Sequence, residues 1–346
     1  MTRPPLPRPT LLPGLPRIWR DQHTLQLGAD PARAVVLEIT DPRLADLLDL
    51  LDGAHSERAV LEHAAAVDLP REQARALLDL LRDAGLLIGG HTLLPSGLPQ
   101  PLRERIRVEA SALALRGGPT PPAQILRRRA EARILVTGRG RLGPLVAVTL
   151  AQAGIGHVRP DLAGVVHPAD LVAAGLLPTD VHRPRAAAVI DAITRSAPGT
   201  ATRPIRPAEV TLTVQVGLDR PAPLLAAAYA RRRQPYLVVG IRDGTPIVGP
   251  FVPAAGSPCL NCLDLHRRDR DPDWPIVAAQ LAGDHPEPCD TATLLAAASY
   301  AAAEALAYVD GARPETIGSA VEINSPGRLR RRRWPPHPRC ACGRDP

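Results

Sequence analysis

The stretch ARILVTGRGRLGPLVAVTLAQAG, residues 132–154, decides the fold. Residues 132–138 are mainly apolar and β-branched, so they predict a buried strand. Residues 142–154 predict a helix that ends at Gly154. The sequence GRGRLG, residues 138–143, lies between them and fits the G-x-G-x-x-G turn of nucleotide-binding folds.

Each glycine of this turn has a distinct task in such folds. We expect Gly138 to make the tight bend, Gly140 to let a phosphate approach, and Gly143 to let helix and strand pack closely. A NAD-dependent dehydrogenase would need an acidic residue about 20 positions further on, and Asp161 follows Gly138 by 23. The motif alone leaves a second interpretation open, in which the glycines only shape a tight turn. The three glycines are therefore candidate nucleotide-binding residues.

Strand and helix patterns alternate after the turn. TLTVQVG (211–217) and PYLVVGI (235–241) predict strands, and PLLAAAYARRR (223–233) predicts the helix between them. Such alternation is typical of an α/β fold, here a Rossmann-like, mostly parallel sheet with helices on both faces.

The N-terminal part predicts a different, smaller fold. Strands are expected at 24–28 and 34–39, then helices from Asp41-Pro42, Ser56 and Pro70, and a closing strand at 86–88. This order predicts a small α+β domain that is winged-helix-like. The domains expected along the chain are an extended proline-rich N-terminus (1–20), the winged-helix-like domain (21–92), a linker with one helix (93–130) and the α/β domain (131–346).

Four of the five cysteines form two close pairs, Cys259 with Cys262 and Cys340 with Cys342. Four thiolates complete a tetrahedron around one zinc ion and leave no position for water. We therefore expect a structural zinc that holds the C-terminal tail to the domain. A redox C-x-x-C pair is the alternative, but the pair follows the proline of SPC and is not expected at the start of a helix after a βαβ strand. Cys289 precedes a predicted helix, whose N-terminus would lower its thiol pKa, and we expect it to be a bystander.

Composition narrows the class of partner. The net charge is +7, the sequence contains no lysine, and arginine runs occur at 127–129, 231–233 and 330–333, which suit an acidic partner or solvated faces. Aromatic residues make up 2% of the chain, so the stacking residues of single-strand binders are scarce and nucleic-acid binding is disfavoured. No run of 18 apolar residues and no signal peptide is present, so we expect a cytoplasmic protein without a membrane partner.

The segments GRGRLG, TLTVQVG, SPCLNCLDLHRRDRDPDWP and HPRCAC occur in this order. Over residues 130–346 they resemble the ThiF family of adenylyltransferases, relatives of the ubiquitin-activating enzymes. The whole chain resembles, more closely, the actinobacterial ThiF-like proteins that bind leader peptides as cyclodehydratase partners in azole-forming peptide biosynthesis. The resemblance implies that residues 17–90 form a PqqD-like clamp in which the leader adds a strand to a sheet edge.

The residues that active family members use for ATP are mostly replaced here. The two acidic positions after the second strand fall on Leu162 and Gly164, with Asp161 one residue away. The phosphate-binding arginine would fall near Ala173, where no arginine is close, while Arg185 matches the family's lysine. The metal-binding aspartate would fall near Gly217, with Asp219 two residues later.

Adenylation needs those groups because negative charge builds on the α-phosphate and must be neutralised. We therefore expect a catalytically degenerate protein without catalytic residues. A site for ATP and Mg²⁺ at the glycine turn and Arg185 is doubtful. The resemblance implies that it presents a precursor leader to a YcaO-type cyclodehydratase, and that it can form a homodimer. The alternative is an active adenylyltransferase acting on a peptide or sulfur-carrier C-terminus. A winged-helix DNA binder is a third class, but its recognition helix, residues 70–84, is nearly neutral.

Overall fold

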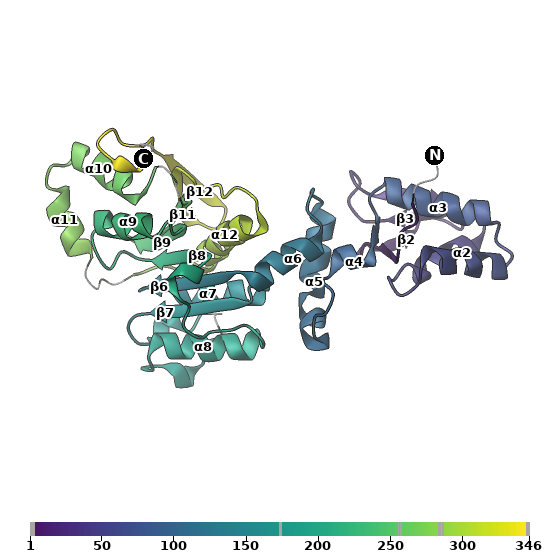
Figure 1. Ribbon diagram of the computed structural model, residues 1–346, viewed down its shortest axis with the longest axis horizontal. Coiled ribbons are helices and arrows are strands. Elements are labelled where there is room, and N and C mark those ends of the chain that lie inside the picture. The colour runs from purple at the N-terminus through teal and green to yellow at the C-terminus, as the bar shows by residue number, and fades with distance from the viewer. Residues whose placement is uncertain are drawn as a thin grey trace. The chain divides into compact units, whose positions relative to one another are not determined.

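The protein is described by a computed structural model that covers residues 4–172, 175–254, 256, 258–282, 285 and 287–343. The chain divides into two compact units, Met1–Arg127 and Arg128–Pro346 (Figure 1). Each unit is described by itself. The finer boundaries predicted at residues 20, 92 and 130 stay predictions.

The first unit contains two small antiparallel sheets. Three strands pair in the order β2-β3-β4, and two pair as β1-β5. Their bounds are β1 Pro9–Leu11, β2 Arg17–Trp19, β3 Thr24–Leu27, β4 Val35–Glu38 and β5 Leu87–Gly89. The predicted strand at 86–88 therefore exists, and it pairs with β1, which lies inside the segment that was predicted to be extended.

Two helices of the first unit begin where their capping residues predict. Asp41 accepts a hydrogen bond from the backbone N–H of Arg43, and Ser56 accepts one from Ala59, which satisfies N–H groups that a helix start leaves open. The helices are α1 Pro42–Asp46, the 3₁₀ turn η1 Leu47–Leu50, α2 Glu57–Ala66, α3 Arg71–Asp83, α4 Gly90–Leu93, α5 Gln100–Arg116 and α6 Pro122–Glu131, which crosses the unit boundary. The prediction of one helix between residues 93 and 130 was wrong, since α5 and α6 both lie there and α4 just enters it. The winged-helix assignment stays a proposal.

The second unit is built on a seven-stranded sheet in the order β12-β11-β10-β9-β8-β6-β7. The strands β7, β6, β8 and β9 are paired in parallel, and β10, β11 and β12 extend the sheet with antiparallel pairing. Their bounds are β6 Arg133–Gly138, β7 His157–Leu162, β8 Leu212–Val216, β9 Tyr236–Arg242, β10 Thr245–Val252, β11 Ser319–Ser325 and β12 Arg328–Arg333. The predicted parallel strands are confirmed, and the sequence did not indicate the antiparallel extension.

Helices cover both faces of this sheet. Side chains alternate between faces along a strand, and in β9 Leu237 and Val239 join one apolar core while Tyr236 and Val238 join another. The first core includes α7, α8 and α12, and the second includes α9 and α10. The helices and 3₁₀ turns are α7 Leu142–Gln152, η2 Pro168–Asp170, η3 Pro178–Asp180, α8 Arg185–Ser196, η4 Pro207–Glu209, α9 Ala222–Arg231, α10 Leu260–Arg270, α11 Trp274–Leu281, α12 Thr291–Asp310 and η5 Ala341–Gly343.

Helix α12 is long and apolar enough to cross a membrane by length and composition, with half of its apolar stretch buried. It packs against α7, and its alanines at 297, 298, 301, 302 and 305 are buried in the first core. A buried core helix also meets this criterion of length and composition, so the apolar character of α12 is weak evidence for a membrane span.

Candidate functional site

The glycine-rich turn joins β6 to α7, as the motif requires. Gly138 has φ +112°, and a Cβ placed there would lie 2.1 Å from the carbonyl oxygen of Val216 on β8. A Cβ on Gly143 would lie 2.7 Å from Cδ2 of Leu162 on β7. Two of the three glycines therefore serve close packing between elements, whatever binds at the turn.

The third glycine faces a carboxylate. A Cβ on Gly140 would lie 2.7 Å from both side-chain oxygens of Glu287, and the backbone N–H of Arg141 donates to Oε2 of Glu287 at 2.8 Å. Arg141 is the N-cap of α7, and the N-terminus of a helix attracts anions through its free N–H groups and its dipole. The anion position of the turn is thus held by a side chain of the protein. No sequence pattern predicts this contact, because Glu287 lies in a loop without a motif and 146 residues away from Arg141.

Two arginines flank Glu287. The guanidinium of Arg141 donates to the carbonyl oxygens of Ala169 and Cys289 at 2.9 and 3.0 Å. Arg185 on α8 is buried, donates to Ala163 O at 2.9 Å and pairs with Asp170 at 3.0 Å. Burial raises the pKa of Glu287, and the hydrogen bond from Arg141 and the charges of both arginines oppose that rise. Arg185 therefore lies near the turn with its charge paired to Asp170, and its role in binding a nucleotide stays a prediction.

Other residues stand at the positions where the resemblance to the ThiF family implied acidic residues. Leu162 packs against Gly143, Gly164 lies beside Arg185, and a Cβ on Gly217 would lie 3.0 Å from the carbonyl oxygen of Arg139. Asp161 is exposed, and its side chain accepts a hydrogen bond from Thr137 at 3.3 Å. Asp219 pairs with the neighbouring Arg220. Neither aspartate lines the cavity beside the turn, and Ala173 lies outside the described residues.

A cavity of about 1320 Å³ extends from the turn along the carboxyl end of the sheet. Among the residues that the structure describes, nine arginines and four acidic residues line it, so this part of the wall carries an excess of positive charge. The arginines are Arg139, Arg141, Arg185, Arg242, Arg267, Arg270, Arg330, Arg332 and Arg333, and the acidic residues are Asp170, Asp243, Glu287 and Glu322. Such a cavity favours an anionic ligand.

The three arginine runs have different environments. Arg129 is buried and makes two hydrogen bonds to the carboxylate of Asp310, so the first run is partly structural. The second run, 231–233, is exposed at the end of α9. Of the three, only the last run, 330–333 on β12, contributes to the cavity.

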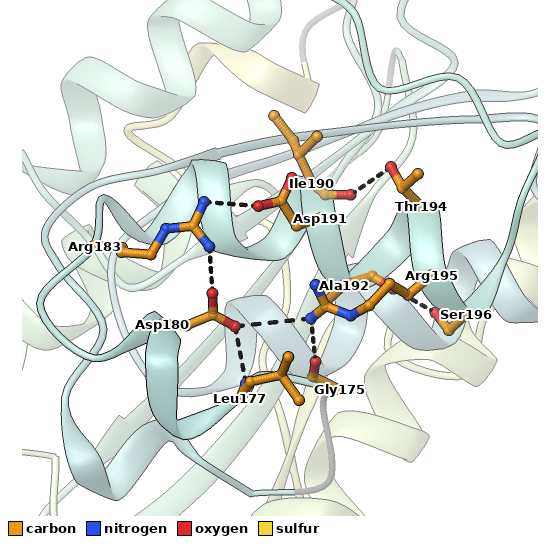
Figure 2. Close-up of polar contacts among 10 residues, drawn as sticks. All are labelled: Gly175, Leu177, Asp180, Arg183, Ile190, Asp191, Ala192, Thr194, Arg195 and Ser196. Atoms are coloured by element: carbon orange, nitrogen blue, oxygen red, sulfur yellow. Dashed lines mark hydrogen bonds and ion pairs between the residues drawn. The ribbon is translucent and has the colours of Figure 1, made fainter.

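A polar network holds the segment that leads into α8 (Figure 2). Asp180 is almost fully buried, accepts a hydrogen bond from the backbone N–H of Leu177 at 2.8 Å and pairs with Arg183. Arg183 also pairs with Asp191 at 2.7 Å, and Arg195 lies 3.7 Å from Asp180. The Leu177 hydrogen bond and these cations hold the pKa of Asp180 below its usual range. This network fixes the N-terminus of α8, where Arg185 stands.

The four cysteines predicted to bind metal lie together. Their sulfur atoms are all within 4.8 Å of one another, and the Cys259–Cys340 and Cys262–Cys342 sulfur pairs are 3.7 and 3.3 Å apart. A tetrahedron of zinc–sulfur bonds of about 2.3 Å has edges of about 3.8 Å. The cluster can therefore hold one metal ion such as zinc. Burial raises the pKa of Cys259 and Cys262, so a cation is needed to keep these thiols as thiolates.

Contacts around the cluster attach the C-terminal tail to α10. His337 is buried and pairs with Asp269 at 2.7 Å, and Arg339 pairs with the same carboxylate. The amide of Asn261 donates to the sulfur of Cys340 at 3.3 Å. These contacts orient the ligands and hold the tail in place.

The setting of the first cysteine pair differs in part from the prediction. Cys259 is the N-cap of α10, so the C-x-x-C pair does begin a helix, although the strand before it, β10, is antiparallel to β9. The contact with the second pair still favours a metal site over a redox pair. Cys289 is partly buried, and burial and the nearby Asp290 raise its thiol pKa, the opposite of activation by a helix.

Comparison with known proteins finds solved structures of similar fold but no relative by sequence. No family model matches the chain, and no curated protein matches it. Solved structures of E. coli MccB do match. MccB with MccA-N7isoASN has a TM-score of 0.65 at 15% identity over 97% of this chain and 100% of that chain. The complex of MccB with AMPCPP and MccA has a TM-score of 0.65 at 16% identity, over 97% of this chain and 99% of that chain.

The chain has the fold of MccB. PaaA has it too, with a TM-score of 0.63 at 16% identity over 93% of this chain and 98% of that chain. One further structure is of the microcin C7 biosynthetic enzyme MccB with N-formylated MccA. Together with the parallel strands and the glycine-rich turn, this likeness supports the predicted Rossmann-like, ThiF-type fold.

Proposed function

We propose that this chain is a catalytically degenerate ThiF-like protein that binds the leader of a precursor peptide and presents it to a YcaO-type cyclodehydratase. The partner would carry out the ATP chemistry and convert Cys, Ser or Thr side chains to azolines. The zinc would be structural, and the protein would act in the cytoplasm, with a homodimer as one proposed assembly.

One observation carries the degenerate assignment. The carboxylate of Glu287 lies against Gly140 and accepts the N–H of Arg141, at the place where a nucleotide phosphate would meet the start of α7. A second negative charge in that place would be repelled, and the cavity lacks the aspartates at 161 and 219 that would hold Mg²⁺. Both features work against adenylation.

The first unit offers an edge for the leader. Strand β2 is the last strand of its sheet, all three of its residues are exposed, and Ile18 and Trp19 are 40% and 49% exposed. An exposed apolar edge strand invites pairing with another chain. The structures of MccB with MccA support peptide binding by this fold.

Pyrophosphate exchange tests the proposal, because only an adenylating enzyme returns labelled pyrophosphate to ATP. We expect no exchange above background with ATP, Mg²⁺ and peptides of varied C-termini. Exchange that depends on one peptide would contradict the degenerate assignment. Leader binding is tested separately by selecting a random-peptide library on the full chain. We expect selected peptides to lose most of their affinity for Trp19→Ala, while binding unaffected by Trp19→Ala would place the peptide elsewhere.

An active adenylyltransferase acting on a peptide or sulfur-carrier C-terminus is the second candidate. The solved complex of MccB with ATP and the position of Arg185 at the turn favour it. It requires Glu287 to leave the anion position when ATP binds. Positive pyrophosphate exchange would establish it.

A further inference from the structure

A cluster of arginines lies in the cavity wall formed by β9, α10 and β12, all within the second unit. Arg242 and Arg332 both pair with Glu322, at 3.3 and 2.7 Å. Glu322 is buried and supplies one negative charge for the two cations. Arg330 lines the same wall. Positive charge therefore exceeds negative charge at this place.

Arg267 on α10 adds a further cation that has no carboxylate partner among the described residues. Its guanidinium lies 4.8 Å from the ring centre of Trp274, whose Nε1–H donates to Asp264 at 2.9 Å. Asp264 is already paired with Arg268 at 2.8 Å. Burial, with the charges of Arg242 and Arg332, lowers the pKa of Arg267 to about 10. A folded protein tolerates such a group best when an anion neutralises it.

We propose that Arg267, Arg242 and Arg332 bind the carboxylates of an acidic, extended peptide segment. Planar guanidinium groups match carboxylates in a bidentate geometry, and Trp274 holds the central one in place. A cavity of about 1320 Å³ exceeds the range of about 300–1000 Å³ typical of small-ligand pockets, which favours a chain over a single small anion. Strand β12, the last in the sheet, borders the cavity and offers an exposed edge to an extended chain.

This site goes beyond the proposed function, which places the leader on the first unit. It does not depend on whether the chain adenylates a substrate. An acidic part of a precursor or of a partner enzyme has the required chemistry. The function of the cluster would be to hold that segment beside the cavity.

Binding of fluorescein-labelled hexaglutamate to the full chain, followed by anisotropy at low salt, tests the proposal. We expect saturable binding that Arg267→Gln weakens by about tenfold or more, since hydrogen bonds to charged groups are worth more than neutral ones. Arg232→Gln is the matched control, because this substitution removes the same charge from an exposed side chain that lies outside the cavity. It should leave the affinity within about twofold.

Three outcomes would overturn the proposal. Equal losses for the two variants would mean non-specific attraction to a basic protein. Absence of hexaglutamate binding would mean that the cluster holds no peptide carboxylate. Tighter, Arg267-dependent binding of a labelled oligothymidine or of ATP would assign the site to phosphates. If Arg267→Gln fails to fold, as judged by circular dichroism, Arg332→Gln on the exposed strand β12 replaces it with the same expected direction. Pyrophosphate exchange bears on the proposed function alone, so the two can fail separately.

Discussion

The cysteine cluster and the glycine-rich turn are both sequence motifs that the fold brings to completion, but they differ in what surrounds them. All four sulfur atoms face one another, and nearby residues such as Asn261 and His337 support them. At the turn the backbone is intact, while Glu287 stands in the anion position and leucine or glycine stands where carboxylates are expected. A motif built from ligands reports chemistry directly, whereas a motif built from glycines reports only a backbone shape.

Removal of the cysteine cluster should have the largest effect. Cys262→Ser takes one thiolate from the tetrahedron, and structural zinc sites supply much of the folding free energy around them. We expect loss of bound zinc and destabilisation of the second unit by at least about 4 kcal/mol. Elemental analysis measures the zinc content, and thermal unfolding measures the stability. Prolonged chelation of the wild type should reproduce both losses. Cys289→Ser is the control and should keep the metal and its stability. Full zinc content in Cys262→Ser would mean that the cluster is not the metal site.

A substitution in the turn should come next, and for reasons of packing. Gly138→Ala places a Cβ 2.1 Å from the carbonyl oxygen of Val216 at φ +112°. We expect a loss of about 3 kcal/mol in urea unfolding, independent of nucleotide. Gly199→Ala is the control, because φ is also positive (+95°) but no atom lies within 4 Å of the new Cβ, so it should cost about 1 kcal/mol. Equal costs would mean that contact with β8 does not constrain the turn.

Disruption of the Asp180 network, which fixes the start of α8 where Arg185 stands, should lower the free energy of unfolding by an intermediate amount. Asp180→Asn leaves Arg183 and Arg195 without their buried carboxylate, so we expect a loss of about 2 kcal/mol at pH 7. The pKa of Asp180 is lowered in the folded state. Its contribution is therefore present above the usual aspartate pKa of about 3.9 and lost as the pH falls through the lower folded value. Urea unfolding at pH 7 and in acid should show the difference between wild type and variant shrinking as the pH falls. A pH-independent difference would show that charge is not its cause.

The sequence predicted the parts of the fold that depend on local pattern. The parallel strands follow apolar runs, and the helix starts at Asp41-Pro42 and Ser56 follow capping residues, so short stretches suffice to identify them. Strand β12 has the sequence RLRRRR, with no apolar alternation, and it exists because β11 pairs with it. Strand β1 likewise depends on β5. Such strands are stabilised by partners that lie elsewhere in the chain.

The candidate site shows the same limit. The cysteines could be chosen from their residue type and spacing, and Arg185 from the resemblance to the ThiF family. Glu287 and the Arg267 cluster could not, because their importance arises only when loops and strands far apart in sequence meet at the cavity. The role of these residues comes from tertiary contacts rather than from a local sequence pattern.

Substitution of Glu287 should have the smallest effect in free energy, here the free energy of ATP binding, and it tests directly whether the turn can hold a nucleotide. Glu287→Ala empties the anion position, so we expect ATP to bind at least about tenfold more tightly than to the wild type, equal to about 1.4 kcal/mol. Calorimetry measures it, with Glu287→Gln as a variant that keeps the size. Burial raises the pKa of Glu287, so protonation as the pH falls should remove the repelling charge and improve ATP binding by the wild type, whereas Glu287→Gln should not share this dependence. Wild-type affinity equal to that of Glu287→Ala would mean that the carboxylate moves aside freely, and the turn would then be a working nucleotide site.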